Sequence, residues 1–452
     1  MRNGRFSFSF RSAMGSGELV SGRDFRIDDA GLCESLLSIL SPRLEDLVHI
    51  AMAVYVADRL SKRNARLVWQ GPARDIDLAV QVLDPEFWRS EPVRKAIIDV
   101  VDFVSGDRWN VEFVPAEGDT KPEVSPFLSS LWPEPPIVCL YSGGLDSAAG
   151  LATRLRASDG GVLAVTAHHQ PGQKTRVRSQ LRALGDHYHR QIDCVLTRTT
   201  LVHAPRASLQ ELTQRCRPFL FAALGGVAAA ASGAPAVEVY ENGIGAMNVP
   251  AMTGMLTAGR STRGCHPAFM RQMSLLVSTI AGRSIEYRLP CQTLTKAQVV
   301  ATLAQDGLSG LAENTVSCVH YPRRVPGPEK SCGVCAACIQ RRQALVSAGV
   351  LEAPSRYQYD VFGGPSAITG IPMGELLPLK AELLHATDVY PNTSSDSIPA
   401  RVLSHLVGTG IATDGGSLQA CVDLLGRYAT EWEELLGQYP SLSTAVLAGG
   451  PN

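Results

Sequence analysis

The chain has no long apolar run, and its first residues lack the features expected of an export signal. None of its 452 residues fall in a stretch of about 18 consecutive apolar residues, which a transmembrane helix would need. The most apolar long window, Phe219–Ala231, is interrupted by Gly225 and Gly226 and predicts a buried helix. Met1–Ser16 alternates Phe with Ser and Arg and lacks the apolar core of a signal peptide. We therefore expect a cytoplasmic protein with no membrane partner.

The chain also lacks an excess of charge. Its 42 basic and 43 acidic residues give a net charge of −1, so nothing in the composition indicates a nucleic-acid partner. It has no Gly-Lys-Ser/Thr at the spacing of a Walker A loop, which excludes a P-loop NTPase. The hydrophobic fraction of 45% is ordinary for a globular protein, and the length predicts two or three domains.

Cysteine, by contrast, is present in two patterns. In a reducing cytosol, seven scattered cysteines are expected to be small buried hydrophobes: Cys33, Cys139, Cys194, Cys216, Cys265, Cys291 and Cys421. The other four are Cys318 and then Cys332, Cys335 and Cys338 at three-residue intervals. This spacing predicts a structural, tetrahedral Zn²⁺ site, because four thiolates fill the coordination of zinc. An iron–sulfur cluster is the alternative.

A strand, a glycine turn and a helix follow one another near the middle of the chain. Ile137–Tyr141 is apolar and favours a strand, Gly143 and Gly144 follow, and Asp146–Arg156 has the character of a helix. Glycines let the backbone approach a bound group closely. Backbone N–H groups and a helix N-terminus around one point favour an anion. The alternative is an ordinary tight turn.

The side chains of this turn, Ser-Gly-Gly-Leu-Asp-Ser, suit a phosphate with a bound metal ion better than a bare phosphate. Ser142 and Ser147 add hydroxyl donors, and Leu145 lies between them. The carboxylate of Asp146 would repel phosphate unless a Mg²⁺ ion lay between the two. The string therefore predicts a phosphate site that includes Mg²⁺.

Strands and helices alternate after Pro136, which predicts a parallel sheet with helices on both faces. In such α/β sheets ligands bind at the carboxyl ends of the strands. The expected strands are Ile137–Tyr141, Gly161–Ala167, Cys194–Thr199, Ala236–Tyr240 and Ile285–Leu289. The expected helices are Lys174–His189, Gln214–Ser232, Ala268–Ala281 and Lys296–Asp306.

Polar residues follow two of these strands. His168 and His169 come after the second strand, where they suit either a metal or base role or a plain polar strand end with Lys174 near phosphates. Glu241 and Asn242 follow the fourth strand, where carboxylate and amide groups suit a base edge or Mg²⁺.

Basic residues stand at two helix starts. Arg215 and Arg217 lie where positive charge opposes the helix dipole, so a bound anion explains them better than helix stability does. Lys296 can reach a phosphate, and Thr295 before it can cap the helix. The loop Arg260–Arg263 is either a lid or a solvated loop.

The flanking regions show no catalytic cluster. Residues 1–134 predict an accessory α+β domain, with Pro122–Pro136 as its linker, and residues 346–452 predict a helical extension. The strands and helices expected in these regions are Arg66–Trp69, Ile76–Val82, Trp109–Val114, Leu44–Leu60, Arg94–Val104, Pro399–Val407 and Leu418–Leu436.

The middle part, residues 135–345, resembles the PP-loop ATP pyrophosphatases and, among them, the 7-cyano-7-deazaguanine synthases (QueC). The matching features are Ser-Gly-Gly-Leu-Asp-Ser at 142–147, Gly172-Gln173, Arg217 with Phe221, Pro290 with Thr295-Lys296-Ala297, and the four cysteines. The flanking regions and the altered Arg260–Pro267 loop depart from QueC. The long form, with Glu241-Asn242-Gly243 and an N-terminal domain, looks more like the QueC-like proteins (QatC type) of bacterial anti-phage operons.

The resemblance implies residue roles. Catalysis would involve Asp146, Ser147 and Lys296. ATP would be bound by Ser142, Gly143, Gly144, Leu145, Asp146, Ser147, Gln173, Arg217, Glu241 and Asn242, and zinc by Cys318, Cys332, Cys335 and Cys338.

The resemblance also implies a reaction. A deazaguanine carboxylate is adenylated by ATP, and an amine then gives an amide or nitrile. The acceptor in the defence relatives would be an amine of a partner protein from the same operon. The alternatives are a tRNA-modifying PP-loop enzyme and a non-catalytic, nucleotide-binding defence scaffold.

Overall fold

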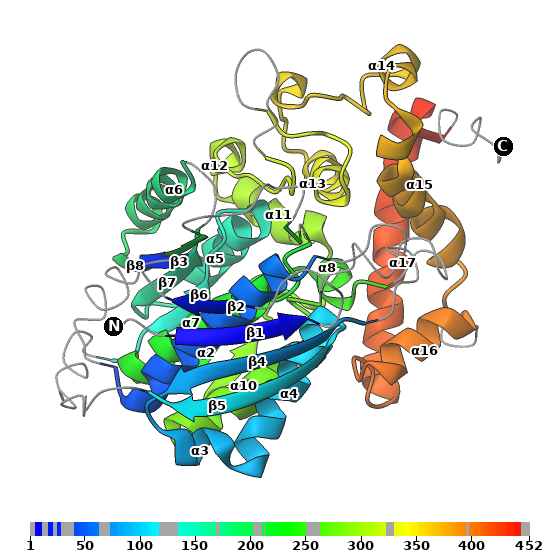
Figure 1. The fold of residues 1–452 in the computed structure, drawn as a ribbon. Helices are drawn as coiled ribbons and strands as arrows, with labels where there is room; N and C mark the ends of the chain where they lie inside the picture. The colour runs from blue at the N-terminus through cyan, green and yellow to red at the C-terminus, as the bar shows by residue number, and fades with distance from the viewer. Residues whose placement is uncertain are drawn as a thin grey trace. The chain divides into compact units, whose positions relative to one another are not determined.

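The computed structural model describes residues 5–10, 17–20, 25–28, 40–62, 73–116, 134–168, 172–201, 210–211, 213–249, 263–321, 330–394 and 397–443 (Figure 1). The chain divides into two compact units, each assembled from separate stretches. The first contains Met1–Ser142, Ser158–Val239 and Gly254–Leu289. The second contains Gly143–Ala157, Tyr240–Thr253 and Pro290–Asn452.

A six-stranded sheet forms the centre of the first unit, in the order β10-β9-β6-β7-β8-β3. Five strands pair in parallel, and β3 pairs antiparallel with β8. Their bounds are β6 Ile137–Leu140, β7 Val162–Ala167, β8 Ile192–Leu201, β9 Ala236–Val239, β10 Glu286–Arg288 and β3 Phe25–Asp28. The predicted parallel sheet is confirmed. The mostly apolar sequences of its central strands are typical of strands that are covered by helices on both faces of a sheet.

Helices cover both faces of this sheet. α6 (Gln173–Tyr188) connects β7 to β8, whereas α7 (Arg217–Ser232) connects β8 back across the sheet to β9. Because such crossovers are right-handed, the two opposite directions place α6 and α7 on opposite faces, as Figure 1 shows. α10 (Pro267–Ala281) packs against β10 and α7. The predicted buried helix in Phe219–Ala231 is confirmed within α7.

A second, four-stranded sheet also belongs to the first unit, in the order β2-β1-β4-β5. Its strands are β1 Arg5–Phe10, β2 Gly17–Val20, β4 Asp75–Val82 and β5 Arg108–Pro115, with helices α2 Pro42–Leu60, α3 Pro85–Arg89 and α4 Glu91–Ser105. The expected strands Ile76–Val82 and Trp109–Val114 and both expected helices are present. Arg66–Trp69 and most of the expected linker lie outside the described residues.

The N-terminal region and the parallel sheet share one hydrophobic core. Helix α2 packs against α7, and α4 packs against α10. Strand β3 extends the six-stranded sheet by pairing with β8. A single cluster of buried side chains runs through these elements, from Leu40 to Leu289.

The second unit is helical. α5 (Leu145–Ala157) packs against α11 (Lys296–Gln305), and α11 packs against α13 (Ala336–Ser347). The remaining helical segments are α8 Gly243–Met247, α12 Ser309–Glu313, η4 Pro354–Arg356, α14 Pro365–Thr369, η5 Met373–Glu375, α15 Leu377–Leu384, η6 His385–Val389, α16 Ala400–Gly408 and α17 Gly415–Gln438. A second core joins the cysteine cluster to α15, α16 and α17.

The C-terminal helices expected from the sequence are present as α16 and α17. Pro399 precedes the first helical position of α16 and serves as its N-cap residue. Among the described residues, no helix is long and apolar enough to cross a membrane.

Candidate functional site

The backbone of the turn after β6 adopts a conformation that glycine favours. Gly143 has a φ of +78°, a left-handed conformation that glycine adopts without steric cost. Its carbonyl accepts a hydrogen bond from the Val316 amide at 3.3 Å, and the Leu145 amide donates to Ser317 Oγ at 3.4 Å. The segment at 316–317 therefore fixes the turn. Neither Val316 nor Ser317 belongs to a motif in the sequence, so the sequence did not predict their contacts with the turn.

Asp146 is the centre of a cluster in the second unit. One carboxylate oxygen accepts from Asn242 Nδ2 at 3.0 Å, and the other forms an ion pair with Lys296 Nζ. Asn242 Nδ2 also lies 2.8 Å from Glu241 Oε1. The side chains of Asp146 and Lys296 are only 16% and 8% exposed, so this charge pair is largely shielded from water. The structure thus brings together four of the residues predicted for the site.

Local capping explains how two of these side chains are oriented. Asn242 is the N-cap of α8 and accepts from the Gly245 amide at 3.0 Å, which leaves its Nδ2 for Asp146 and Glu241. Thr295 forms a capping box with Gln298, so α11 begins at Lys296. The predicted cap at Thr295 is therefore confirmed.

Three other predicted nucleotide-binding residues, Ser142, Gln173 and Arg217, belong to the first unit. Gln173 is buried, and its Nε2 donates to the Ser142 carbonyl at 3.0 Å. Arg217 is the first residue of α7, and burial lowers its pKa. Its guanidinium makes no hydrogen bond to another described residue, and its role toward an anion stays a prediction. Ser147 is buried on the first turn of α5, in the second unit.

Two further stretches that the sequence singled out are only partly described. His168 is buried, and its amide donates to the Thr197 carbonyl at 2.9 Å, whereas His169 lies outside the described residues. Arg260, Ser261 and Thr262 also lie outside them. Arg263 is described: its guanidinium donates to the Phe103 carbonyl at 3.1 Å and lies 5.0 Å from the centre of the Phe103 ring.

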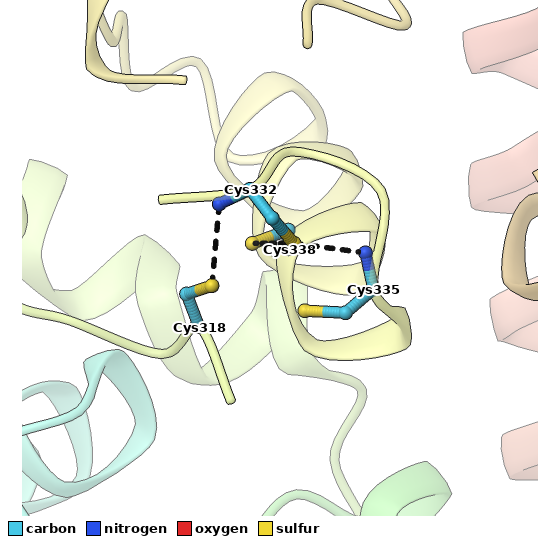
Figure 2. A group of neighbouring side chains, drawn as sticks. All are labelled: Cys318, Cys332, Cys335 and Cys338. Carbon is cyan, nitrogen blue, oxygen red and sulfur yellow. Dashed lines mark hydrogen bonds between the residues drawn. The ribbon is translucent and has the colours of Figure 1, made fainter. Parts of the chain in front are cut away.

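The four cysteines meet in the second unit. Cys318, Cys332, Cys335 and Cys338 are all buried, and their sulfur atoms lie within 4.8 Å of one another (Figure 2). The sulfurs of Cys332 and Cys338 are 3.9 Å apart. Tetrahedral zinc with Zn–S bonds of about 2.3 Å requires sulfurs about 3.8 Å apart. The donor set and its spacing therefore fit a metal such as zinc.

Backbone geometry prepares this cluster. The amides of Cys332 and Cys335 donate to the sulfurs of Cys318 and Cys332, each at 3.3 Å, which stabilises negative charge on sulfur. Gly333 has a φ of +84°, and a Cβ at this position would lie 1.9 Å from the Tyr359 carbonyl oxygen. The loop between the second and third cysteines therefore requires glycine.

The two arginines after the cysteines pair with carboxylates. Arg341 donates to Glu352 at 2.7 Å and to the Ala312 carbonyl at 2.6 Å. Arg342 forms an ion pair with Asp360, and its guanidinium lies 4.4 Å from the centre of the Phe362 ring. These contacts tie α13 to the segment that follows it.

Two comparisons with known proteins bear on this site. Residues 240–349 match the family model described as QueC, the queuosine biosynthesis protein. That stretch contains Glu241, Asn242, Lys296 and the four cysteines. The chain is also 28% identical over 242 residues to a 7-cyano-7-deazaguanine synthase of Anaeromyxobacter sp. (strain Fw109-5). That alignment covers 95% of the relative and 49% of this chain, so the chain is similar to a QueC protein over about half of its length.

Proposed function

We propose that the chain is a QueC-like, ATP-dependent enzyme that adenylates the carboxylate of a 7-deazaguanine. The observation that carries the proposal is the cluster of Asp146, Asn242 and Lys296 beside a glycine turn, with one carboxylate held by an amide and an ammonium. The similarity to a 7-cyano-7-deazaguanine synthase supports the choice of substrate class. ATP would bind at the turn that follows β6.

The residues at this turn supply what a triphosphate requires. Backbone N–H groups of Gly143, Gly144 and Asp146 and the hydroxyls of Ser142 and Ser147 suit phosphate oxygens, and Leu145, whose amide donates to Ser317 Oγ, completes the loop. Lys296 supplies positive charge beside Asp146. The carboxylates of Asp146 and Glu241 fit Mg²⁺, an oxygen-binding cation that would offset phosphate charge when bound.

The proposed reaction has two steps, and each forms one bond and breaks another. A substrate carboxylate oxygen attacks the α-phosphorus of ATP, and the bond to the β-phosphate breaks, so pyrophosphate leaves and an acyl-adenylate forms. An amine nitrogen then attacks the acyl carbon, AMP leaves, and an amide results. Lys296 and the turn amides would stabilise the charge that develops on the leaving pyrophosphate.

The acceptor amine comes from ammonia or from a partner protein. About half of the chain lies outside the alignment with the synthase, and this added length suits an acceptor larger than ammonia. A partner protein and a role in anti-phage defence belong to this proposal. With ammonia, a second ATP would convert the amide to a nitrile.

The four cysteines are proposed to hold a structural Zn²⁺ ion. Cys318, Cys332, Cys335 and Cys338 would supply every ligand, so the ion would support the fold and leave no open position for substrate. Cys335 is the N-cap residue of α13, which packs against α11, the helix that carries Lys296. Zinc would thus stabilise a neighbour of the reaction site.

The test is release of pyrophosphate by purified protein given ATP, Mg²⁺ and 7-carboxy-7-deazaguanine. We expect AMP and pyrophosphate in equal amounts, and loss of about a hundredfold or more in rate for Asp146→Asn. Asp186→Asn, the same change at an exposed position of α6, is the matched control and should retain the rate. Equal rates in the two variants would contradict the assigned site.

A further inference from the structure

The C-terminal helix α17 contacts the segment that leads into Lys296. Glu431 of α17 accepts a hydrogen bond from Thr295 Oγ1, and one helical turn earlier Arg427 Nη2 donates to the Thr293 carbonyl at 2.7 Å. Both contacts lie within the second unit. Two side chains of one helix therefore hold both ends of a three-residue segment immediately before Lys296.

The hydroxyl of Thr295 is the link between Glu431 and α11. A threonine hydroxyl has one proton to donate and lone pairs to accept with. The proton goes to Glu431, so a lone pair is directed to the Gln298 amide, which donates at 3.2 Å. The Thr295 amide completes the capping box by donating to Gln298 Oε1 at 2.9 Å. Glu431 thereby fixes the rotation of the hydroxyl that caps the helix.

The position of Glu431 is itself fixed. Its second carboxylate oxygen accepts from Gln343 Nε2 of α13 at 3.0 Å. Burial removes water from the Glu431 carboxylate and raises its pKa. The hydrogen bonds from Thr295 and Gln343 offset part of this increase. Tyr428 before it and Trp432 after it are buried in the core of the second unit, which anchors α17.

We propose that Glu431 is a positioning residue, which acts through Thr295 to hold Lys296 against Asp146. The proposal rests on the proposed function, because Lys296 matters for rate only if phosphate chemistry occurs beside it. Helix α17 lies outside residues 240–349, the stretch that matches the QueC family model. A helix outside the matched stretch therefore supports a residue within it.

The first test compares Glu431→Ala with Glu431→Gln in the full chain, with pyrophosphate release as the readout. The alanine variant should lose about ten- to a hundredfold in kcat, because displacement of a catalytic group by about 1 Å costs this much. The KM for ATP should change by less than about threefold, since the lost interaction is stronger in the transition state. Glu433→Ala, exposed on the same helix, is the control and should leave kcat unchanged.

The glutamine variant should recover most of kcat. Its carboxamide oxygen can accept from Thr295, and its NH₂ group can face Gln343 once that amide rotates. Gln343 Oε1 is buried and has no hydrogen-bond partner among the described residues, so this rotation supplies it with one. Recovery by the conservative variant distinguishes positioning from bulk packing.

A second readout does not depend on activity. Hydrogen–deuterium exchange of the peptide that spans Thr293–Val300 should be at least about tenfold faster in Glu431→Ala than in Glu433→Ala, and unchanged in Glu431→Gln. If Glu431→Ala does not fold, Thr295→Val and Thr295→Ser replace it, and only the valine variant should show the loss.

Each outcome bears on one claim. Unchanged kcat and unchanged exchange in Glu431→Ala, with an active wild type, would overturn the positioning role. A wild-type chain that cleaves no ATP would overturn the proposed function. In that case the exchange comparison would still support or overturn the structural step from Glu431 to Lys296.

Discussion

At the scale of single residues, the candidate site depends on a shielded charge pair. Asp146 and Lys296 are 150 positions apart and meet because α5 packs against α11. The loop motif and the threonine–lysine pair were visible in the sequence. Glu431 was not predicted, although it lies among the buried positions of α17 near Tyr428 and Leu435, where an acidic residue requires a buried partner.

Replacing the lysine should remove charge but little volume. We expect Lys296→Met to lower the rate of pyrophosphate release by about a hundredfold or more, because a preorganised positive charge is lost. Single-turnover assays at saturating ATP measure this. Lys380→Met, an exposed lysine of α15, is the control. A matching rate in the two variants would remove Lys296 from the mechanism.

Gly333 should tolerate no side chain. Gly333→Ala places a Cβ 1.9 Å from the Tyr359 carbonyl oxygen, in addition to the strain at φ +84°. Gly349→Ala is the matched control, because it has a φ of +69° but no atom within 4 Å of the added Cβ. Urea unfolding should show a cost of about 1–2 kcal/mol for the control and more for Gly333→Ala. Equal losses would contradict the close approach.

At the scale of elements, regular βα alternation was predictable and short or irregular elements were not. Strands β6 to β10 and helices α6, α7, α10 and α11 follow apolar periodicity, which reports burial directly. Helix α8 has five residues, too few for a periodic pattern. Strand β3 depends on pairing with β8, a contact that its own four residues do not encode. Helix α13 begins inside the cysteine motif, which concealed it.

The ion pair between α13 and Glu352 should make stability fall in acid. Burial alone would raise the pKa of Glu352, but the hydrogen-bonded guanidinium of Arg341 outweighs burial and holds the pKa below 4.5. The unfolded chain therefore binds the proton first as pH falls, so this stabilisation is present above pH 4.5 and lost below it.

Urea unfolding midpoints across this pH range measure the effect. The wild type should lose stability steeply below pH 4.5. Glu352→Gln should be less stable at neutral pH, because Arg341 loses a buried partner, and its decline in acid should be shallower. Parallel profiles for the two proteins would show that Glu352 is not the titrating group.

At the scale of the whole molecule, each unit is assembled from three separate stretches of chain. Composition and linkers suggest boundaries along the sequence, near 134 and 345, and these remain a prediction. They do not reveal which stretches pack together, because packing between distant segments has no local signal. The alignment with the synthase likewise covers about half of the chain.

Zinc binding should require the intact fold. We expect one zinc ion per chain by native mass spectrometry, and a lower Tm after chelation, because the four thiolates join separate segments. Cys332→Ser should bind zinc at least about tenfold more weakly. Cys291→Ser, which changes a buried cysteine outside the cluster, should keep the ion. Full zinc occupancy in Cys332→Ser would contradict the assigned ligands.

The central claim is that ATP is cleaved between its α- and β-phosphates at the turn after β6. Phosphorus NMR of the products from ATP, Mg²⁺ and 7-carboxy-7-deazaguanine tests it most directly. The account predicts AMP and pyrophosphate in equal amounts, formed only with the carboxylate present and absent in Asp146→Asn. ADP and inorganic phosphate, or no cleavage by the zinc-loaded chain, would contradict it.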